Sequence, residues 1–390
     1  MKPATLAPES PALIELGPQV AEVFATDPDA LAVIAEELGP GPFALVCLFV
    51  SPDCRFSEIA EAAAQRFGSA QVMACTTAGE IGRAGYVEGR VVAVAFPETA
   101  FSATALMIDK LGDRDAQAFG DTLVRERLSL AERAPDRPHS FAFLLIDGLS
   151  LKEDILTAAL SPALGGVPLF GGSAGDGVDF ARTRVALNGV VAQDAAVLAL
   201  VRTTLPTKVF SIDHLLPTDD RMVVTEADPN ARIVKSINAE PAAREYARIV
   251  GKDPEQLDTF TFAAHPVVVR IGADHHVRAI QRVTDNGELQ FFSAIDEGMV
   301  LTVAEKQDMV THLDAELSAL ADPVQPLAIL GCDCLLRRIE AEQAQSVRAL
   351  SDTLARHRVV GFSTYGEQIG PLHVNQTITG VAFYPPKEGG

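Results

Sequence analysis

The stretch ACTTAGEIG (Ala74–Gly82) is written almost a second time near the other end of the chain, as FSTYGEQIG (Phe362–Gly370). Both copies contain a hydroxyl residue, one variable residue, Gly-Glu and then Ile-Gly, with an extra Gln in the second copy. Each copy follows a short apolar run, which predicts that the turn comes directly after a buried strand. We infer two related halves that share one turn, through ancient duplication or through convergent use of the turn.

Strand and helix patterns alternate around the first copy. The continuous apolar run FALVCLFV (Phe43–Val50) predicts a buried strand, and the pattern from Ser57 to Gly68 predicts a helix. Strand-dense sequence follows the first copy. Two of its runs, RVVAVAF and FSATALMI, are expected to form neighbouring strands joined by the turn Pro97–Thr99.

The pattern changes near residue 230, where closely spaced strands and a hairpin signal at Asp285–Gly287 begin to dominate. Residues 305–321 and 340–357 then predict two long helices, each followed by a strand. The predicted fold class is α/β (α+β), with layered mixed β-sheets flanked by helices. We divide the chain into an N-terminal extension (1–25) and two domains, 26–229 and 230–390, which suits a length of 390 residues.

The composition limits the classes of partner. Of the residues, 48% are hydrophobic and 22% charged, as in globular proteins, and the net charge is −20. An acidic surface repels phosphate backbones and anionic lipids, so neither nucleic acid nor a membrane is an expected partner. The absence of Trp also argues against a stacking surface for single-stranded nucleic acid.

The cysteine content predicts a reducing compartment. Five cysteines in a chain of this size do not form a secreted disulfide framework, and no segment has the pattern of a signal peptide. The apolar runs are too short to span a bilayer. We therefore expect a cytoplasmic protein.

Four glycine-rich turns follow apolar strands: TTAGEIG, GGSAGDG, GCDC and STYGEQIG. Glycines at such positions let backbone amides approach a bound group, so these turns predict a small-ligand site; rigid structural turns are the alternative. Thr76, Thr77, Gly172 and Gly366 are the expected backbone donors. The other predicted ligand-binding residues are Gly79, Glu80, Ser173, Asp176, Cys332, Tyr365, Glu367 and Asn375.

An enzyme is the alternative from a different class. The segment GGSAG matches the nucleophile motif of serine hydrolases, but that motif requires a following helix, whereas DGVDFARTRVAL leads into a strand. Cys332 would be the nucleophile of a thiol hydrolase. No nucleophile, base and orienting residue converge in the sequence, so we expect a non-catalytic protein in which Glu80 and Glu367 organise the turns.

The histidines form no compact metal-binding pattern. A single axial histidine is nevertheless enough to hold haem, which keeps haem as a candidate cofactor. His373, after the second turn, and His265, before a predicted strand, are the candidate haem ligands. His275 and His276 are expected to be solvated in a polar turn.

These turns, in this order, resemble the FIST family, which combines an N-terminal FIST domain with a C-terminal FIST_C domain. The first half is similar through ACTTAGEIG and LFGGSAGDG, and the second through NAEPAAREYA, HPVVVRIG, ILGCDC and VGFSTYGEQIG. The resemblance covers nearly the whole chain after about residue 20. The motifs are short, and their order makes the match specific.

The resemblance implies an intracellular signal-input protein that binds a small ligand. Stand-alone members resemble haem-binding, nitric-oxide-sensing FIST proteins that regulate a separate sensor histidine kinase or cyclic-di-GMP enzyme. Small amino-acid-like ligands without haem are the alternative that the family implies. A second copy of the chain, forming a homodimer, is a further candidate partner.

Overall fold

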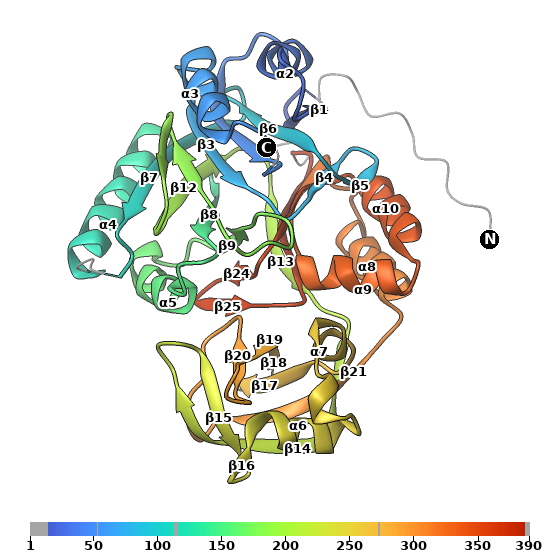
Figure 1. The fold of residues 1–390 in the computed structure, drawn as a ribbon. Helices are drawn as coiled ribbons and strands as arrows, with labels where there is room; N and C mark the ends of the chain where they lie inside the picture. Colours follow the sequence, from blue (N-terminus) through green and yellow to red (C-terminus); the bar gives the residue numbers. More distant parts are fainter. Residues whose placement is uncertain (1–14, 53, 113–115, 272–273, 387–390) are drawn as a thin grey trace.

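The computed structural model describes residues 15–52, 54–112, 116–271 and 274–386. In this part of the chain, three six-stranded sheets surround a common centre, and an eight-stranded sheet forms a separate lobe below them (Figure 1). We call the three sheets and their helices the body, and residues 215–306 the lobe. The predicted α/β class, with mixed sheets flanked by helices, is confirmed.

The three body sheets have the same topology. Each has an edge strand, a long antiparallel strand, a central parallel pair and a two-stranded hairpin, in that order. Sheet 1 contains β1 (Gln19–Phe24), β6 (Arg90–Pro97), β2 (Phe43–Val50), β3 (Gln71–Thr76), β10 (Val185–Leu187) and β11 (Val190–Ala192). Sheet 2 contains β7 (Phe101–Asp109), β12 (Ala195–Thr203), β8 (His139–Asp147), β9 (Leu169–Ala174), β24 (Glu367–Ile369) and β25 (Leu372–Val374). Sheet 3 contains β13 (Thr207–Ile212), β26 (Ile378–Phe383), β22 (Ala328–Cys334), β23 (Val359–Thr364), β4 (Glu80–Gly82) and β5 (Gly85–Val87).

Each hairpin belongs in sequence to one unit and in space to another. The turn after β3 sends β4–β5 into sheet 3, the turn after β9 sends β10–β11 into sheet 1, and the turn after β23 sends β24–β25 into sheet 2. The exchange is cyclic, so the body consists of three interlocked units of one topology. The sequence predicted two related halves, whereas the body contains three units of one topology.

Helices cover the outer faces of the three sheets, and the inner faces share one core (Figure 1). Every residue of β2 is buried. Side chains on one face of the strand, such as Phe49, pack in the common core, and those on the other face, such as Leu48, pack against the helices. Phe49 stacks on Phe362 of sheet 3 at 4.5 Å between ring centroids. The covering helices are α2 (Ala30–Leu38), α3 (Phe56–Arg66), α4 (Ala116–Arg133), α5 (Glu153–Leu164), α8 (Met309–Leu320), α9 (Leu335–Gln343) and α10 (Val347–Arg356).

The lobe is inserted between β13 and α8. Its strands run in the order β18-β17-β21-β14-β15-β20-β19, with β16 paired to β15. Two α-helices, α6 (Ala242–Val250) and α7 (Thr259–Ala264), and the short 3-10 helix η1 (Pro254–Gln256) complete it. Its strands are β14 (Leu215–Asp228), β15 (Ile233–Ile237), β16 (Glu240–Pro241), β17 (Val267–Ile271), β18 (Asp274–Val277), β19 (Ile280–Val283), β20 (Leu289–Phe291) and β21 (Val300–Lys306).

Three details differ from the sequence predictions. The turn Pro97–Thr99 joins strands of two different sheets, β6 and β7, because the chain crosses the core there and Phe96 packs on Phe101. Residues 340–357 form two helices, α9 and α10, separated at residues 344–346, where Gln345 has a φ of +54°. The helix predicted at 305 begins at Met309, after Asp308 caps it and β21 ends.

The division into an extension and two domains stays a prediction. Of residues 1–25, the first fourteen lie outside the described residues, and β1 lies in the rest. The boundary at residue 230 falls in the turn between the paired strands β14 and β15. Among the described helices, none is long and apolar enough to cross a membrane.

Candidate functional site

The turns that exchange the three hairpins share one sequence pattern: hydroxyl residue, variable residue, glycine, acid. The copies are Thr77–Glu80, Ser173–Asp176 and Thr364–Glu367. The middle copy is less similar to the two stretches quoted above, because it has Asp in place of Glu and no Ile-Gly after it. A search for the shorter pattern at strand ends would have found it.

The three turns meet at the centre of the body and bond to one another. Backbone amides of each turn donate to carbonyl groups of a neighbouring turn, so the chain itself uses donors that could otherwise face a ligand. These bonds run from Gly175 N to Thr76 O (3.0 Å), Gly177 N to Thr77 O (3.1 Å), Ala78 N to Ser363 O (2.9 Å), Ser363 N to Gly79 O (2.7 Å), Ser173 N to Gly366 O (2.8 Å) and Tyr365 N to Ser173 O (3.2 Å).

The two glutamates of the turns are buried and hold their own turns together. Glu80 is hydrogen-bonded to the Thr77 hydroxyl and accepts from Arg90 N at 3.0 Å. Glu367 is bonded in the same way to Thr364, and its other oxygen accepts from the Thr377 hydroxyl at 2.7 Å. Burial raises the pKa of Glu80 to about 7 and that of Glu367 to about 8, against the lowering effect of these hydrogen bonds. Both carboxyl groups therefore retain protons well above the usual range.

The third acid, Asp176, holds the loop that leads to β10. Its carboxylate accepts from the backbone amides of Ala181 (2.9 Å) and Arg182 (2.5 Å) and from the Tyr365 hydroxyl. The same hydroxyl accepts from Asp176 N at 3.1 Å, and the Tyr365 ring stacks on Phe180 with 4.4 Å between centroids. Tyr365 thus ties the third turn to the loop after the second.

Removal of this hydroxyl is expected to destabilise the body. In Tyr365→Phe, the carboxylate and the amide of Asp176 each lose a buried partner, so we expect a loss of about 2 kcal/mol in the free energy of unfolding, measured by urea denaturation. Tyr384→Phe is the matched control, because its hydroxyl makes one bond, to Leu320 O, from a half-buried side chain. Equal losses in the two variants would contradict the role of Tyr365.

The glycines of this region allow close packing. A Cβ atom on Gly172 would lie 2.5 Å from Thr364 Cγ2, and one on Gly366 would lie 2.3 Å from His373 Cε1. Cys332 lies against Gly172, and Asn375 donates to the Tyr365 carbonyl at 3.4 Å. The structure therefore brings the twelve predicted ligand-binding residues into one buried junction. Their binding of a ligand stays a prediction.

Several buried polar atoms beside this junction have no hydrogen-bond partner in the described part of the chain. Such atoms commonly contact a water molecule or a ligand. They include Ser363 Oγ, Gln368 Oε1, His373 Nε2, Asn375 Oδ1 and both polar side-chain atoms of Gln376.

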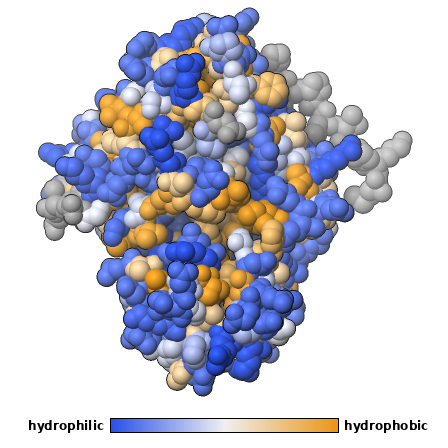
Figure 2. All heavy atoms as spheres, in the orientation of Figure 1, coloured by the Kyte–Doolittle hydropathy of each residue, from blue (hydrophilic) through white to orange (hydrophobic). Residues whose placement is uncertain are grey.

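A cavity of about 450 Å³ lies between the body and the lobe, next to the β24–β25 hairpin that follows the third turn. Thr377 links it to the junction, because its hydroxyl bonds Glu367. On the opposite wall, His275 Nε2 lies 3.1 Å from Asp213 Oδ1. Figure 2 shows apolar residues gathered across the middle of this face, over the lower part of the body. The lining residues are Ser211, Asp213, His275, His276, Val277, Ile369, Gly370, Pro371, Leu372, Val374 and Thr377.

This cavity was not predicted from the sequence. His275 and His276 were expected to be solvated, whereas both are half-buried and line the cavity from β18. The two predicted haem ligands, His373 and His265, do not line this cavity. Leu372 and Val374 of β25 line the cavity, so His373 between them faces the other side of the strand, where burial lowers its pKa. His265, half-buried, follows the last residue of α7.

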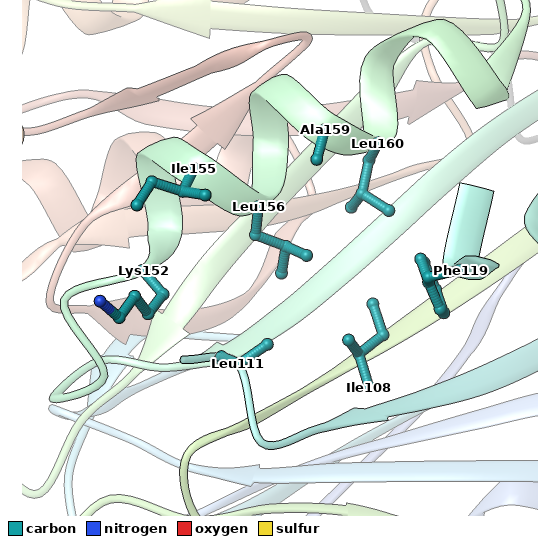
Figure 3. Close-up of a pocket in the computed structure, with 8 residues that line it drawn as sticks. All are labelled: Ile108, Leu111, Phe119, Lys152, Ile155, Leu156, Ala159 and Leu160. Carbon is teal, nitrogen blue, oxygen red and sulfur yellow. The ribbon is translucent and has the colours of Figure 1, made fainter. Parts of the chain in front are cut away.

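A second, smaller pocket lies on the outer surface of the body. Its volume is about 60 Å³, and Figure 3 shows the apolar side chains of α5 facing Ile108 and Phe119 across it. Lys152 is the one charged residue among those that line it in the described chain. Because a ligand site usually combines an apolar wall with several convergent polar groups, we assign the candidate site to the cavity between body and lobe.

Comparison with known proteins gives the same family as the turns suggest. The model of the FIST N domain matches residues 44–240, and that of the FIST C domain matches residues 242–370. An uncharacterized protein of Methanocaldococcus jannaschii is 23% identical in an alignment of 354 positions that covers 80% of this chain and 67% of the relative. The domain matches together cover most of the chain.

Proposed function

Because this chain belongs to the FIST family of signal-sensing proteins that bind small ligands, we propose that its ligand occupies the cavity between the body and the lobe. One observation carries the proposal: the walls come from both parts, β18 of the lobe and the β24–β25 hairpin of the body. A ligand that touches both walls favours one arrangement of the two parts over others. The change in the arrangement of body and lobe on ligand binding would be the signal.

The chain passes between the two parts at a cluster of charged residues. His214, just before β14, lies 3.0 Å from Glu340 of α9, and Lys306 at the end of β21 lies 3.2 Å from the same carboxylate. Arg337 donates to the other nitrogen of His214 at 3.1 Å. The two points where the chain passes between body and lobe, at His214 and at Lys306, are therefore both bonded to side chains of α9. We propose that a separate partner, a sensor histidine kinase or a cyclic-di-GMP enzyme, reads the arrangement of lobe and body.

Haem is the ligand that we propose first. The cavity offers two histidines, His275 and His276, among aliphatic residues such as Ile369 and Leu372, and this combination suits a haem pocket. Adjacent residues of β18 project to opposite faces of the strand, and His275 is the one that contacts Asp213 at the cavity wall. The His275 imidazole would therefore hold the haem iron, and Asp213 would orient it. When bound, haem supplies an iron atom that can take a diatomic gas such as nitric oxide.

A haem titration tests this proposal. Purified protein is expected to develop a Soret band with saturable binding, and the double variant His275→Ala/His276→Ala to weaken that binding by about tenfold or more. His139→Ala, at a half-buried position at the start of β8, is the matched control. His265→Ala and His373→Ala complete the set. Loss of the band in either of these two, with the cavity pair unaffected, would refute the cavity as the haem site.

A well-folded protein without a Soret band would leave the second candidate, a small amino-acid-like ligand. Asp213 offers a carboxylate for an ammonium group, and Ser211 and Thr377 offer hydroxyl groups. In that case, an amino acid should raise the melting temperature of the protein, and Asp213→Asn should abolish the rise. If no amino acid raised the melting temperature, the proposal that the cavity binds an amino-acid-like ligand would be refuted.

We propose a binding role rather than catalysis. The Ser173 hydroxyl accepts from Gln368 Nε2 at 3.0 Å, and no helix follows β9 to present it. Burial raises the pKa of the Cys332 thiol well above its ordinary value, which disfavours the reactive thiolate. Both observations support the non-enzymatic reading. No cysteine in the described part of the chain forms a disulfide bond, which supports a place in the reducing cytoplasm.

A further inference from the structure

We propose that the lobe carries a second site, for the phosphate or carboxylate group of a small anionic molecule. The site is a cavity of about 430 Å³ on the side of the lobe sheet away from α6. The proposal does not depend on the ligand proposed above. The cavity is lined by Pro217, Thr218, Arg221, Val268, Val269, Arg270, His275, Met299, Val300 and Thr302.

The register of the lobe sheet explains how the polar side chains of this cavity come together. Arg221 of β14 pairs with Thr302 of β21, and Thr302 pairs with Val268 of β17, so their side chains share one face. Arg270 lies two residues beyond Val268 and therefore projects on that face as well, opposite its partner His275. Two arginines, a histidine and a threonine thus surround one space, although they come from four strands.

The charge of this space is unusual for the chain. The chain has 52 acidic and 32 basic residues, yet among the described residues that line the cavity none is acidic. Asp219 and Asp220 lie in the irregular part of β14 between Pro217 and Arg221, where both are exposed and neither lines the cavity. Within the described chain, the side chains of Arg221 and Arg270 form no hydrogen bond or ion pair. The donors of both guanidinium groups are therefore open to an anion that enters the cavity.

The donors define the class of ligand. Guanidinium groups bind carboxylate and phosphate oxygens in pairs, and Thr302 can add a hydroxyl donor. Val268, Val300 and Met299 give the cavity an apolar side, which suits a molecule with an organic part. His275 also lines the first cavity, so the two ligands would share one side chain.

Calorimetry with inorganic phosphate and with succinate, each against sodium chloride at equal ionic strength, tests the site. We expect the full chain to bind at least one of the two anions saturably. Binding of phosphate would identify a phosphate site, and binding of succinate would identify a carboxylate site. Arg221→Ala/Arg270→Ala should lower that affinity by about tenfold or more. Arg244→Ala is the matched control, because it removes an exposed arginine of the same lobe that does not line the cavity.

The variants must keep the melting temperature of the wild type, and both arginines are exposed, so folding is expected to be retained. The site would be refuted if neither phosphate nor succinate bound to the wild type. It would also be refuted if the double variant and Arg244→Ala reduced affinity equally, since a general loss of positive charge would then explain the effect.

Discussion

Replacement of Gly361 by alanine is expected to lower the free energy of unfolding by more than about 3 kcal/mol, or to prevent folding. Gly361 lies in β23 with a φ of +152°, and a Cβ atom there would lie 1.8 Å from the carbonyl oxygen of Gly331 in β22. That oxygen belongs to the backbone of a central strand, which pairs on its other side with Gly380 of β26. The clash can be relieved only if the strands separate, and urea denaturation followed by circular dichroism would measure the cost.

Gly120→Ala is the matched control for this experiment. Gly120 lies within α4, and a Cβ atom there would lie 4.0 Å from the methyl group of Ala163, which is an ordinary contact. Alanine is expected to stabilise that helix by about 0.5–1 kcal/mol. A Gly361→Ala protein as stable as Gly120→Ala would show that β22 and β23 do not approach each other as described.

Stability is expected to fall as the pH rises from 5 to 9, and Glu367→Gln should remove much of that fall. The carboxyl of Glu367 has a pKa of about 8 in the folded protein and an ordinary value of 4.5. Between these values the folded state binds more protons than the unfolded state, so stability is present in full below pH 4.5 and is lost as the pH rises through 8. Glutamine keeps the shape of the side chain without a charge. Its amide oxygen can accept from the Thr377 hydroxyl, and its NH2 group can donate to the Thr364 hydroxyl, which donates to Glu367 in the wild type. At pH 9 we expect the variant to be more stable than the wild type by about 5 kcal/mol, since each unit of the rise from 4.5 to about 8 corresponds to about 1.4 kcal/mol.

The difference between variant and wild type, measured by urea denaturation at pH 5, 7 and 9, isolates this carboxyl from the other titrating groups. Glu316→Gln, at an exposed position of α8, should show no such pH dependence. Glu80, with a pKa of about 7, should add a smaller fall of the same sign. A constant difference at the three pH values would mean that Glu367 is ionised in the folded protein.

The elements of the fold could be predicted from the sequence better than their partners could. The continuous apolar run of β2 is typical of a strand buried on both faces, and the structure confirms it. The pairing of β4 with β23 could not be predicted, because nothing local to Glu80 indicates that Phe362 lies opposite. Residues 97–99 form a short polar turn in either arrangement, so the turn alone cannot distinguish a hairpin from a crossing between sheets.

The same limit applies to the candidate site. The glycine turns could be located because glycine, hydroxyl and acidic residues stand together in the sequence directly after apolar runs. The cavity between body and lobe has no such local signal. Asp213, His275 and Leu372 become neighbours there only because three separate segments fold together, and a pair of adjacent histidines in a polar segment is usually solvated.

The cyclic exchange of hairpins has a consequence for biosynthesis. Sheet 3 is completed by β4–β5 from the first unit, and sheet 2 is completed by β24–β25, which a ribosome makes near the end of translation. Until then β9 presents an open edge, and β4–β5 have no sheet to join. The body therefore closes only after nearly the whole chain has emerged, so its first half must be kept from associating with other chains during synthesis.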